Sequence, residues 1–129
     1  MAFQIAVASK TAMLNTLVTS AGSTSSLVIY NGTAPATPDT ALSGNSVLAT
    51  CTCAATMGVV STNVLTLNTL TGVNAVLTGT ATFYRLLASN GTTVLWQGSV
   101  GVSASELNLI TTTITAGGPV NITSLTVTL

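Results

Sequence analysis

Two residues, Asn90 and Gly91, constrain the fold more than any others, because they lie between two runs rich in alternating apolar side chains. A two-residue hairpin turn needs positive φ at both central positions, and Asn and Gly adopt that conformation most readily. The sequence therefore predicts an antiparallel hairpin whose turn is centred on this pair.

The register of this hairpin follows from the length of its turn. If the turn has two residues, Leu87 faces Val94. Arg85 then faces Trp96 on the same side of the sheet. Both faces are rich in apolar residues, and a sheet covered on both faces is typical of a sandwich. We expect a mainly β fold: a single antiparallel β-sandwich domain over residues 1–129, with one N-terminal α-helix.

The helix is predicted over residues 9–22. Its apolar residues recur at spacings of three and four, as on one face of a helix; they are Met13, Leu14, Leu17, Val18 and Ala21. Ser9 is the expected N-cap and Gly22 the expected C-terminal stop. The stripe either packs on the sheet, which we favour, or forms an arm that docks on a neighbouring molecule.

Further strands are expected where β-branched runs are bounded by turn residues. They cover residues 27–31, 47–53, 64–67, 107–115 and 120–129. Residues 32–45 contain two prolines and should form a long loop, because Pro cannot donate to a strand ladder; residues 116–119 should form a turn. The apolar phase of the last strand changes near Ser124, which predicts a β-bulge there.

Charge is nearly absent from the chain. Only four of the 129 residues are charged, the net charge is zero and there is no His. Ordinary soluble domains carry about 25% charged residues. Copies with so little charge repel one another weakly, so a free monomer should be poorly soluble. This composition favours a protein whose surface is largely covered in an assembly.

The same composition argues against several functions. General acid–base and nucleophilic catalysis need a base that this chain does not offer, so no catalytic residues are assigned. No cofactor or metal motif is present, and two basic residues cannot neutralise many phosphates. No apolar run approaches the 20 residues of a membrane span. The N-terminus does not resemble a signal peptide, so synthesis in a cytosol is expected.

Cys51 and Cys53 are one residue apart, so in a strand both point to the same face. This spacing disfavours a disulfide between them. We expect two small buried side chains; disulfides to neighbouring subunits are the alternative.

Arg85 stands out because it lies on the apolar face predicted to hold Trp96. We expect its guanidinium to stack on the indole and to pair with Glu106 or Asp39. The alternative is a contact to a partner subunit. These four residues are the candidate structural or interface residues.

Several segments together resemble small β-rich structural proteins encoded in the virion gene blocks of tailed phages. The resemblance rests on residues 29–35, 79–85, 94–100, 106–109 and 116–120, together with the predicted helix. It implies a virion-associated β-protein without an enzymatic role, and it assigns no site residues.

Three functions are compatible with these features. The first is a capsid decoration or cement subunit that binds the major capsid protein and its own copies, as a trimer or dimer. The second is a tail component such as a tube, terminator or fibre-associated subunit. The third is a binding module outside the virion. Near-neutral composition favours the first two, and scarce charge disfavours a tube lining that faces DNA.

Overall fold

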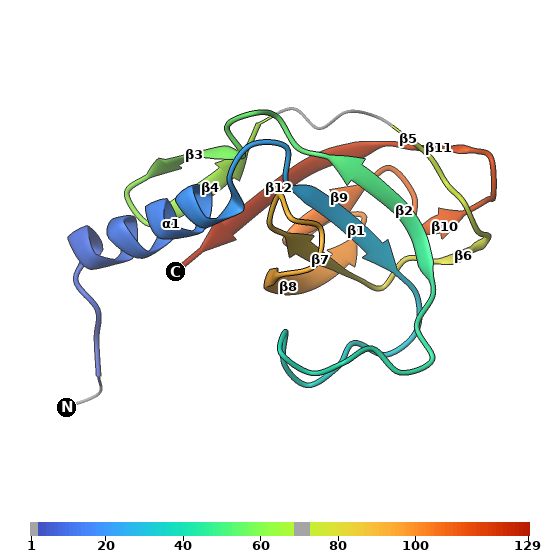
Figure 1. Cartoon of the computed structure of the whole chain (residues 1–129), viewed down its shortest axis with the longest axis horizontal. Coiled ribbons are helices and arrows are strands. Elements are labelled where there is room, and N and C mark those ends of the chain that lie inside the picture. The colour runs from blue at the N-terminus through green and yellow to red at the C-terminus, as the bar shows by residue number, and fades with distance from the viewer. Residues whose placement is uncertain (1–2, 69–72) are drawn as a thin grey trace.

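The computed structural model describes residues 3–68 and 73–129; the rest of the predicted 1–129 domain lies outside the described residues. The described part contains one helix, α1 (Val7–Ala21), and twelve strands (Figure 1). The strands are β1 (Ser26–Tyr30), β2 (Val47–Thr52), β3 (Gly58–Ser61), β4 (Val64–Leu67), β5 (Val73–Asn74), β6 (Gly79–Thr80), β7 (Phe83–Leu87), β8 (Val94–Gly101), β9 (Leu107–Leu109), β10 (Thr113–Ile114), β11 (Pro119–Val120) and β12 (Ile122–Thr128). The prediction of a mainly β fold with one N-terminal helix is confirmed.

Eight strands form one curled sheet in the order β2-β1-β7-β8-β9-β12-β4-β3, and two short ladders join β6 to β10 and β5 to β11. Neighbouring strands are antiparallel except β8 and β9, which are parallel and share only two residue pairs. This short junction divides the sheet into two halves, β2-β1-β7-β8 and β9-β12-β4-β3. The two halves are the layers of the sandwich.

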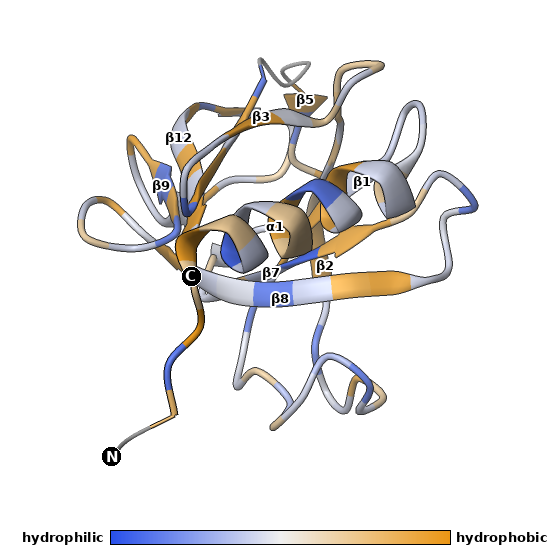
Figure 2. Ribbon diagram, turned by 90° about the vertical axis from the view of Figure 1, so that its left-hand side faces the viewer, coloured by the Kyte–Doolittle hydropathy of each residue, from blue (hydrophilic) through white to orange (hydrophobic). Residues whose placement is uncertain are grey.

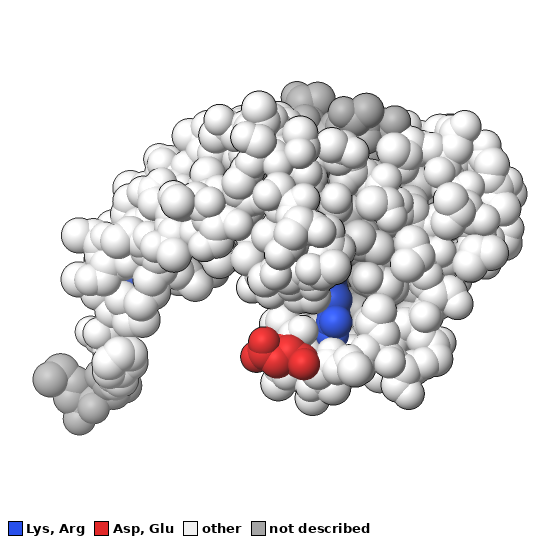
Figure 3. Space-filling model, in the orientation of Figure 1, with Lys and Arg blue, Asp and Glu red and all other residues white. Residues whose placement is uncertain are grey.

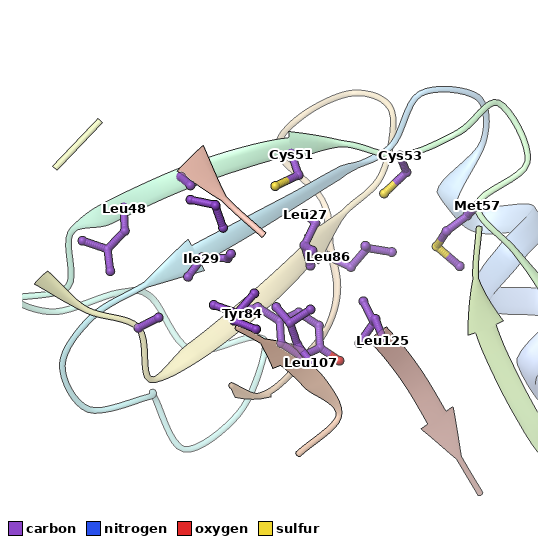
Figure 4. Close-up of a cluster of buried hydrophobic side chains, with 14 of the residues drawn as sticks. Leu27, Ile29, Leu48, Cys51, Cys53, Met57, Tyr84, Leu86, Leu107 and Leu125 are labelled. Atoms are coloured by element: carbon purple, nitrogen blue, oxygen red, sulfur yellow. The ribbon is translucent and has the colours of Figure 1, made fainter. Parts of the chain in front are cut away.

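One hydrophobic core draws on both halves and on the helix. It includes Leu27 and Ile29 of β1, Leu86 of β7, Leu107 of β9 and Leu125 of β12, and each is at most 3% exposed (Figure 4). Because these side chains come from strands far apart in the sequence, the core fixes how the sheet curls. Burial of apolar area is the main favourable contribution to such a fold.

Helix α1 begins two residues before the predicted start. Its N-cap is Ala6, with no side-chain cap, so the prediction that Ser9 caps the helix is wrong. Ser9 lies within the first turn, where its N–H donates to the Ala6 carbonyl at 3.0 Å. The C-terminal stop at Gly22 is confirmed, since this residue has φ of 71°, a value that favours glycine.

The apolar stripe of α1 packs on β3, β4 and β8, as favoured from the sequence. Leu14 and Ala21 are fully buried, and Leu17 and Val18 pack partly against the core. Met13 is 47% exposed, so its assignment to the buried stripe is wrong. Figure 2 shows α1 alongside β8, with the N-terminal segment extending away from both.

Most strand predictions agree with the structure to within one residue, and residues 64–67 match β4. The predicted strand over 107–115 is interrupted, because only its ends form β9 and β10. The predicted strand over 120–129 is divided between β11 and β12, and strands β3, β5 and β6 were not predicted. The bulge expected near Ser124 is confirmed by a register shift between Ile122 and Ser124 in the pairing of β12 with β9.

The hairpin of β7 and β8 forms around Asn90 and Gly91, but its predicted register is only partly correct. Leu87 faces Val94 as expected, and the register then shifts by one residue. The extra residue is Leu95 on β8, so two residues of one strand oppose one of the other, as in a β-bulge. The side-chain Oδ1 of Asn90 accepts hydrogen bonds from the main-chain N–H groups of Thr92 and Thr93, at 3.0 Å each. These bonds close the turn.

The shift changes which residues share a face of the hairpin. Arg85 faces Gln97, and Trp96 faces Leu86. Since side chains alternate along a strand, Arg85 and Trp96 lie on opposite faces of the sheet. The prediction that they face each other is therefore wrong.

Candidate functional site

The four candidate residues do not form one cluster. Arg85 lies on the outer face of β7, whereas Trp96 and Glu106 lie on the side of the core. Asp39 belongs to the segment of residues 32–45 between β1 and β2, which we call the cover loop, and it is exposed. The structure thus contains two separate polar arrangements on opposite faces of one hairpin.

The first arrangement fastens the cover loop to the outer face of the sheet. Arg85 is 4% exposed, and its Nη2 donates to the Thr40 carbonyl at 2.7 Å and, at a long 3.5 Å, to that of Thr37. Its Nε donates to Gln97 Oε1 at 3.2 Å. Gln97 in turn donates through Nε2 to the Pro35 carbonyl at 2.7 Å. Two facing side chains of β7 and β8 therefore hold three carbonyl groups of the loop.

The ends of the cover loop are also fixed. Asn45 Nδ2 donates to the Asn31 carbonyl at 2.8 Å, and the Ser46 N–H donates to Asn31 Oδ1 at 2.7 Å. Thr82 Oγ1 donates to the Gly32 carbonyl at 2.6 Å. The loop is long, but its hydrogen bonds give it a defined position.

A second apolar cluster shares the outer face with Arg85. Tyr30 and Phe83 stack with ring centroids 5.1 Å apart and planes 15° apart, and Val28 lies beside them. All three are at most 5% exposed. Burial raises the pKa of Tyr30, and the nearby Arg85 lowers it in part. The cover loop explains why β7 is buried on both faces.

The predicted partners of Arg85 are therefore wrong. Its guanidinium lies across the sheet from the Trp96 indole, and in the described part of the chain it donates to carbonyl and amide oxygens rather than to Glu106 or Asp39. A buried cation can be satisfied in this way, because carbonyl dipoles stabilise positive charge and the guanidinium offers five donors. The role as a structural residue inside one chain is consistent with these contacts.

The second arrangement lies on the core side of the hairpin. Trp96 Nε1 donates to Tyr84 Oη at 2.9 Å, and Tyr84 Oη donates to Glu106 Oε2 at a long 3.5 Å. Gly98 makes this approach feasible, since a Cβ there would lie 2.7 Å from Tyr84 Cε1 and 2.8 Å from Glu106 Oε1. The pKa of Tyr84 is raised, mainly by burial and also by Glu106, while the Trp96 hydrogen bond lowers it. The phenol thus stays neutral and serves as a structural hydrogen-bonding group.

Sequence reasoning missed Gln97 and Tyr84. The reason is the bulge at Leu95, which the sequence does not reveal. Beyond it, each side chain of β8 lies on the opposite face of the sheet from the one predicted, so Gln97 joins Arg85 and Trp96 joins Tyr84. The run from Val94 to Trp96 has no Gly or turn residue that would mark a bulge.

Cys51 and Cys53 both point into the core, and both are free thiols (Figure 4). They are at most 3% exposed, which confirms the prediction of small buried side chains. Burial, with a further contribution from Cys53, raises the pKa of the Cys51 thiol to about 11. A disulfide to a neighbouring subunit would require these side chains to leave the core.

The surface consists almost entirely of uncharged groups, and the face in Figure 3 shows only a few charged atoms. Several large apolar side chains are more than half exposed: Phe3, Val7, Val59, Val76, Val102 and Ile110.

Within residues 3–68 and 73–129, no group of three or more His, Cys, Asp or Glu side chains is placed to hold a metal ion. No helix in the described part has the length and apolar character needed to cross a membrane.

Comparisons with protein-family models, with curated proteins and with solved structures find no match to this chain.

Proposed function

We propose that the chain is a structural subunit of a tailed-phage virion: a capsid decoration or cement subunit that binds the major capsid protein and its own copies. The observation that carries this proposal is the set of large apolar side chains exposed on a nearly uncharged surface. A free protein with such a surface tends to associate, whereas a subunit covers it in its assembly.

The mechanism is the burial of apolar surface between neighbouring subunits. A stable interface buries about 800 Å² on each partner, and the described structure has 6719 Å² of accessible surface. Two such contacts would therefore cover about a quarter of it. Each Å² of apolar surface removed from water contributes about 25 cal/mol before the entropy of association is subtracted.

Charge contributes little to this mechanism. Of the four charged residues, Arg85 is buried under the cover loop and Glu106 is partly buried beside Tyr84. This leaves Lys10, which is partly buried, and Asp39, which is exposed. One cation and one anion cannot give a subunit strong electrostatic steering toward a partner.

The internal hydrogen bonds support a structural role. Arg85, Gln97 and Thr82 fix the cover loop, and Tyr84 and Trp96 bind each other within the fold. These polar side chains are thus engaged in holding the chain in one shape. Several segments also resemble structural proteins of tailed phages, and this resemblance is the reason for proposing a tailed-phage virion as the assembly.

A salt wash of purified phage particles tests the proposal. Particles of the phage that encodes the chain are washed in about 1 M NaCl, where the Debye length is about 3 Å, and then separated from released protein. Apolar contacts are not weakened by screening, so we expect the chain to remain with the particles. A Lys10→Gln, Asp39→Asn double variant should be retained equally well. Release in high salt, or absence of the chain from unwashed particles, would contradict the proposal.

A further inference from the structure

Strand β8 has an open edge. Residues 94–99 pair with β7 on one side, and β9 pairs only with Val100 and Gly101 on the other. The Val100 N–H donates to the carbonyl of Thr82, the residue directly before β7, and so points toward the β7 side. Main-chain groups alternate in direction along an antiparallel strand, so the N–H groups of Gln97 and Ser99 point away from β7. In the described part of the chain, no strand receives them.

This edge carries few of the features that prevent strands from associating. Natural proteins protect edges with charged side chains, Pro or bulges. Residues 94–99 contain no charge and no Pro, and the bulge at Leu95 affects only the start of β8. Ser99 is exposed, and the five residues before it are partly exposed. Helix α1 also packs on β8, so the part of the edge left for an added strand is the one around the exposed Ser99.

The same chain also has an extended segment without a partner strand. Residues 3–6, which we call the N-terminal arm, precede α1 and run away from the body of the molecule (Figures 1 and 2). Ala6 has the extended angles φ −63° and ψ 148°. Phe3 is 90% exposed, which is the largest value among the exposed apolar side chains. Phe3 and Ile5 are separated by one residue, so in an extended strand their side chains point to the same face.

We infer that the N-terminal arm of one copy adds as a strand to the open edge of β8 in a second copy. An added strand satisfies main-chain groups on both partners, and its alternate side chains supply apolar contact. Neither the arm nor residues 94–99 carries a charge, so no like-charge repulsion opposes the contact. Exchange of one element between identical subunits is a low-cost route to small oligomers.

The occupant is another copy because each chain presents both halves of the contact. The arm extends away from its own sheet, and its apolar side chains line an open groove with Lys10 rather than a packed interior. The inference concerns contacts between copies and does not depend on a virion. A wild-type chain that is monomeric in solution but present in particles would refute the arm contact and leave the proposed virion role standing.

Site-directed crosslinking tests the contact directly. Copies carrying Gln4→Cys are mixed with differently tagged copies carrying Ser99→Cys and are oxidised gently. The native thiols are buried and give little background. We expect a disulfide between the two differently tagged copies. A Gln4→Cys chain mixed with an Asn63→Cys chain is the control pair and should remain uncrosslinked, since Asn63 lies in the turn between β3 and β4. Equal crosslinking of both pairs would overturn the inference.

Sedimentation equilibrium supplies a second test with variants that keep the fold. Ser99→Pro removes the outward N–H without a loss to the β7 ladder, and Phe3→Ser removes the exposed aromatic ring. We expect each to weaken self-association by about tenfold or more, while Ser99→Thr behaves as wild type. A wild-type chain that is monomeric at all concentrations, or association that these variants leave unchanged, would overturn the inference. Crosslinking of a Gln4→Cys, Ser99→Cys chain only to itself would show that the arm folds back on its own sheet, and would also overturn it.

Discussion

Replacement of Arg85 by Ala tests the account of the outer face most sharply. The change removes the hydrogen bonds from the guanidinium to Thr40 and Gln97. Hydrogen bonds to charged groups contribute about 1.5–3 kcal/mol each, so their sum is about 3–6 kcal/mol. Relief of the cost of burying a cation offsets part of this loss. We expect the free energy of unfolding to fall by about 3 kcal/mol.

Calorimetry measures the effect. For a domain of this size, a loss of about 3 kcal/mol lowers the melting temperature by about 10 °C. Lys10→Ala is the matched control, because Lys10 is only partly buried and lies away from the cover loop. It should change the stability by less than about 0.5 kcal/mol.

Limited proteolysis shows whether the loss acts through the cover loop. Without Arg85, residues 32–45 should be cut faster near Leu42, which is 38% exposed, because local opening of the loop becomes easier. Equal melting temperatures of Arg85→Ala and the wild type would refute this reasoning. A lower melting temperature with unchanged loop cleavage would refute the fastening role.

The remaining predictions concern the core and the hairpin turn. Gly98→Ala should lower the stability by about 2 kcal/mol, because its Cβ would lie 2.7 Å from Tyr84 Cε1. Gly91→Ala meets open space, but φ is 76° there, so its free energy of unfolding should fall by about 1 kcal/mol. Calorimetry measures both changes. Tyr84→Phe should cost about 1–2 kcal/mol in a urea titration, since it removes a buried hydrogen-bond acceptor. A thiol reagent should label Cys51 and Cys53 only on unfolding. The Cys51 pKa rises from 9.0 to about 11 on folding. The thiol's contribution to stability is therefore complete below pH 9 and is lost as pH rises toward 11. Over this pH range, the melting temperature of Cys51→Ala should decline less than that of the wild type.

Local signals predicted the fold where they depend on one element. The spacing of Leu14, Val18 and Ala21 predicted the helix, and its C-terminal end follows from Gly22. The change of apolar phase near Ser124 predicted the bulge in β12, because a slip of one residue moves side chains between faces.

Features that depend on tertiary contacts were not visible in the sequence. The bulge at Leu95 reverses the facing of Trp96, and no turn residue marks it. The partners of Arg85 are carbonyl groups of the cover loop, which every residue type presents equally. A charged side chain suggested a charged partner, but the fold supplied main-chain dipoles instead. The contacts expected for Arg85 were therefore wrong, and Asp39 takes part in neither polar arrangement.

The most direct test of the virion proposal is a copy count of this chain in purified phage particles. Quantitative mass spectrometry gives its molar ratio to the major capsid protein. If the chain is a decoration subunit that covers the head, we expect a simple whole-number ratio of its copies to those of the capsid protein. This ratio should be unchanged after the salt wash. Absence of the chain from the particles would contradict the proposal, and a count far below that of the capsid protein would contradict its placement on the head.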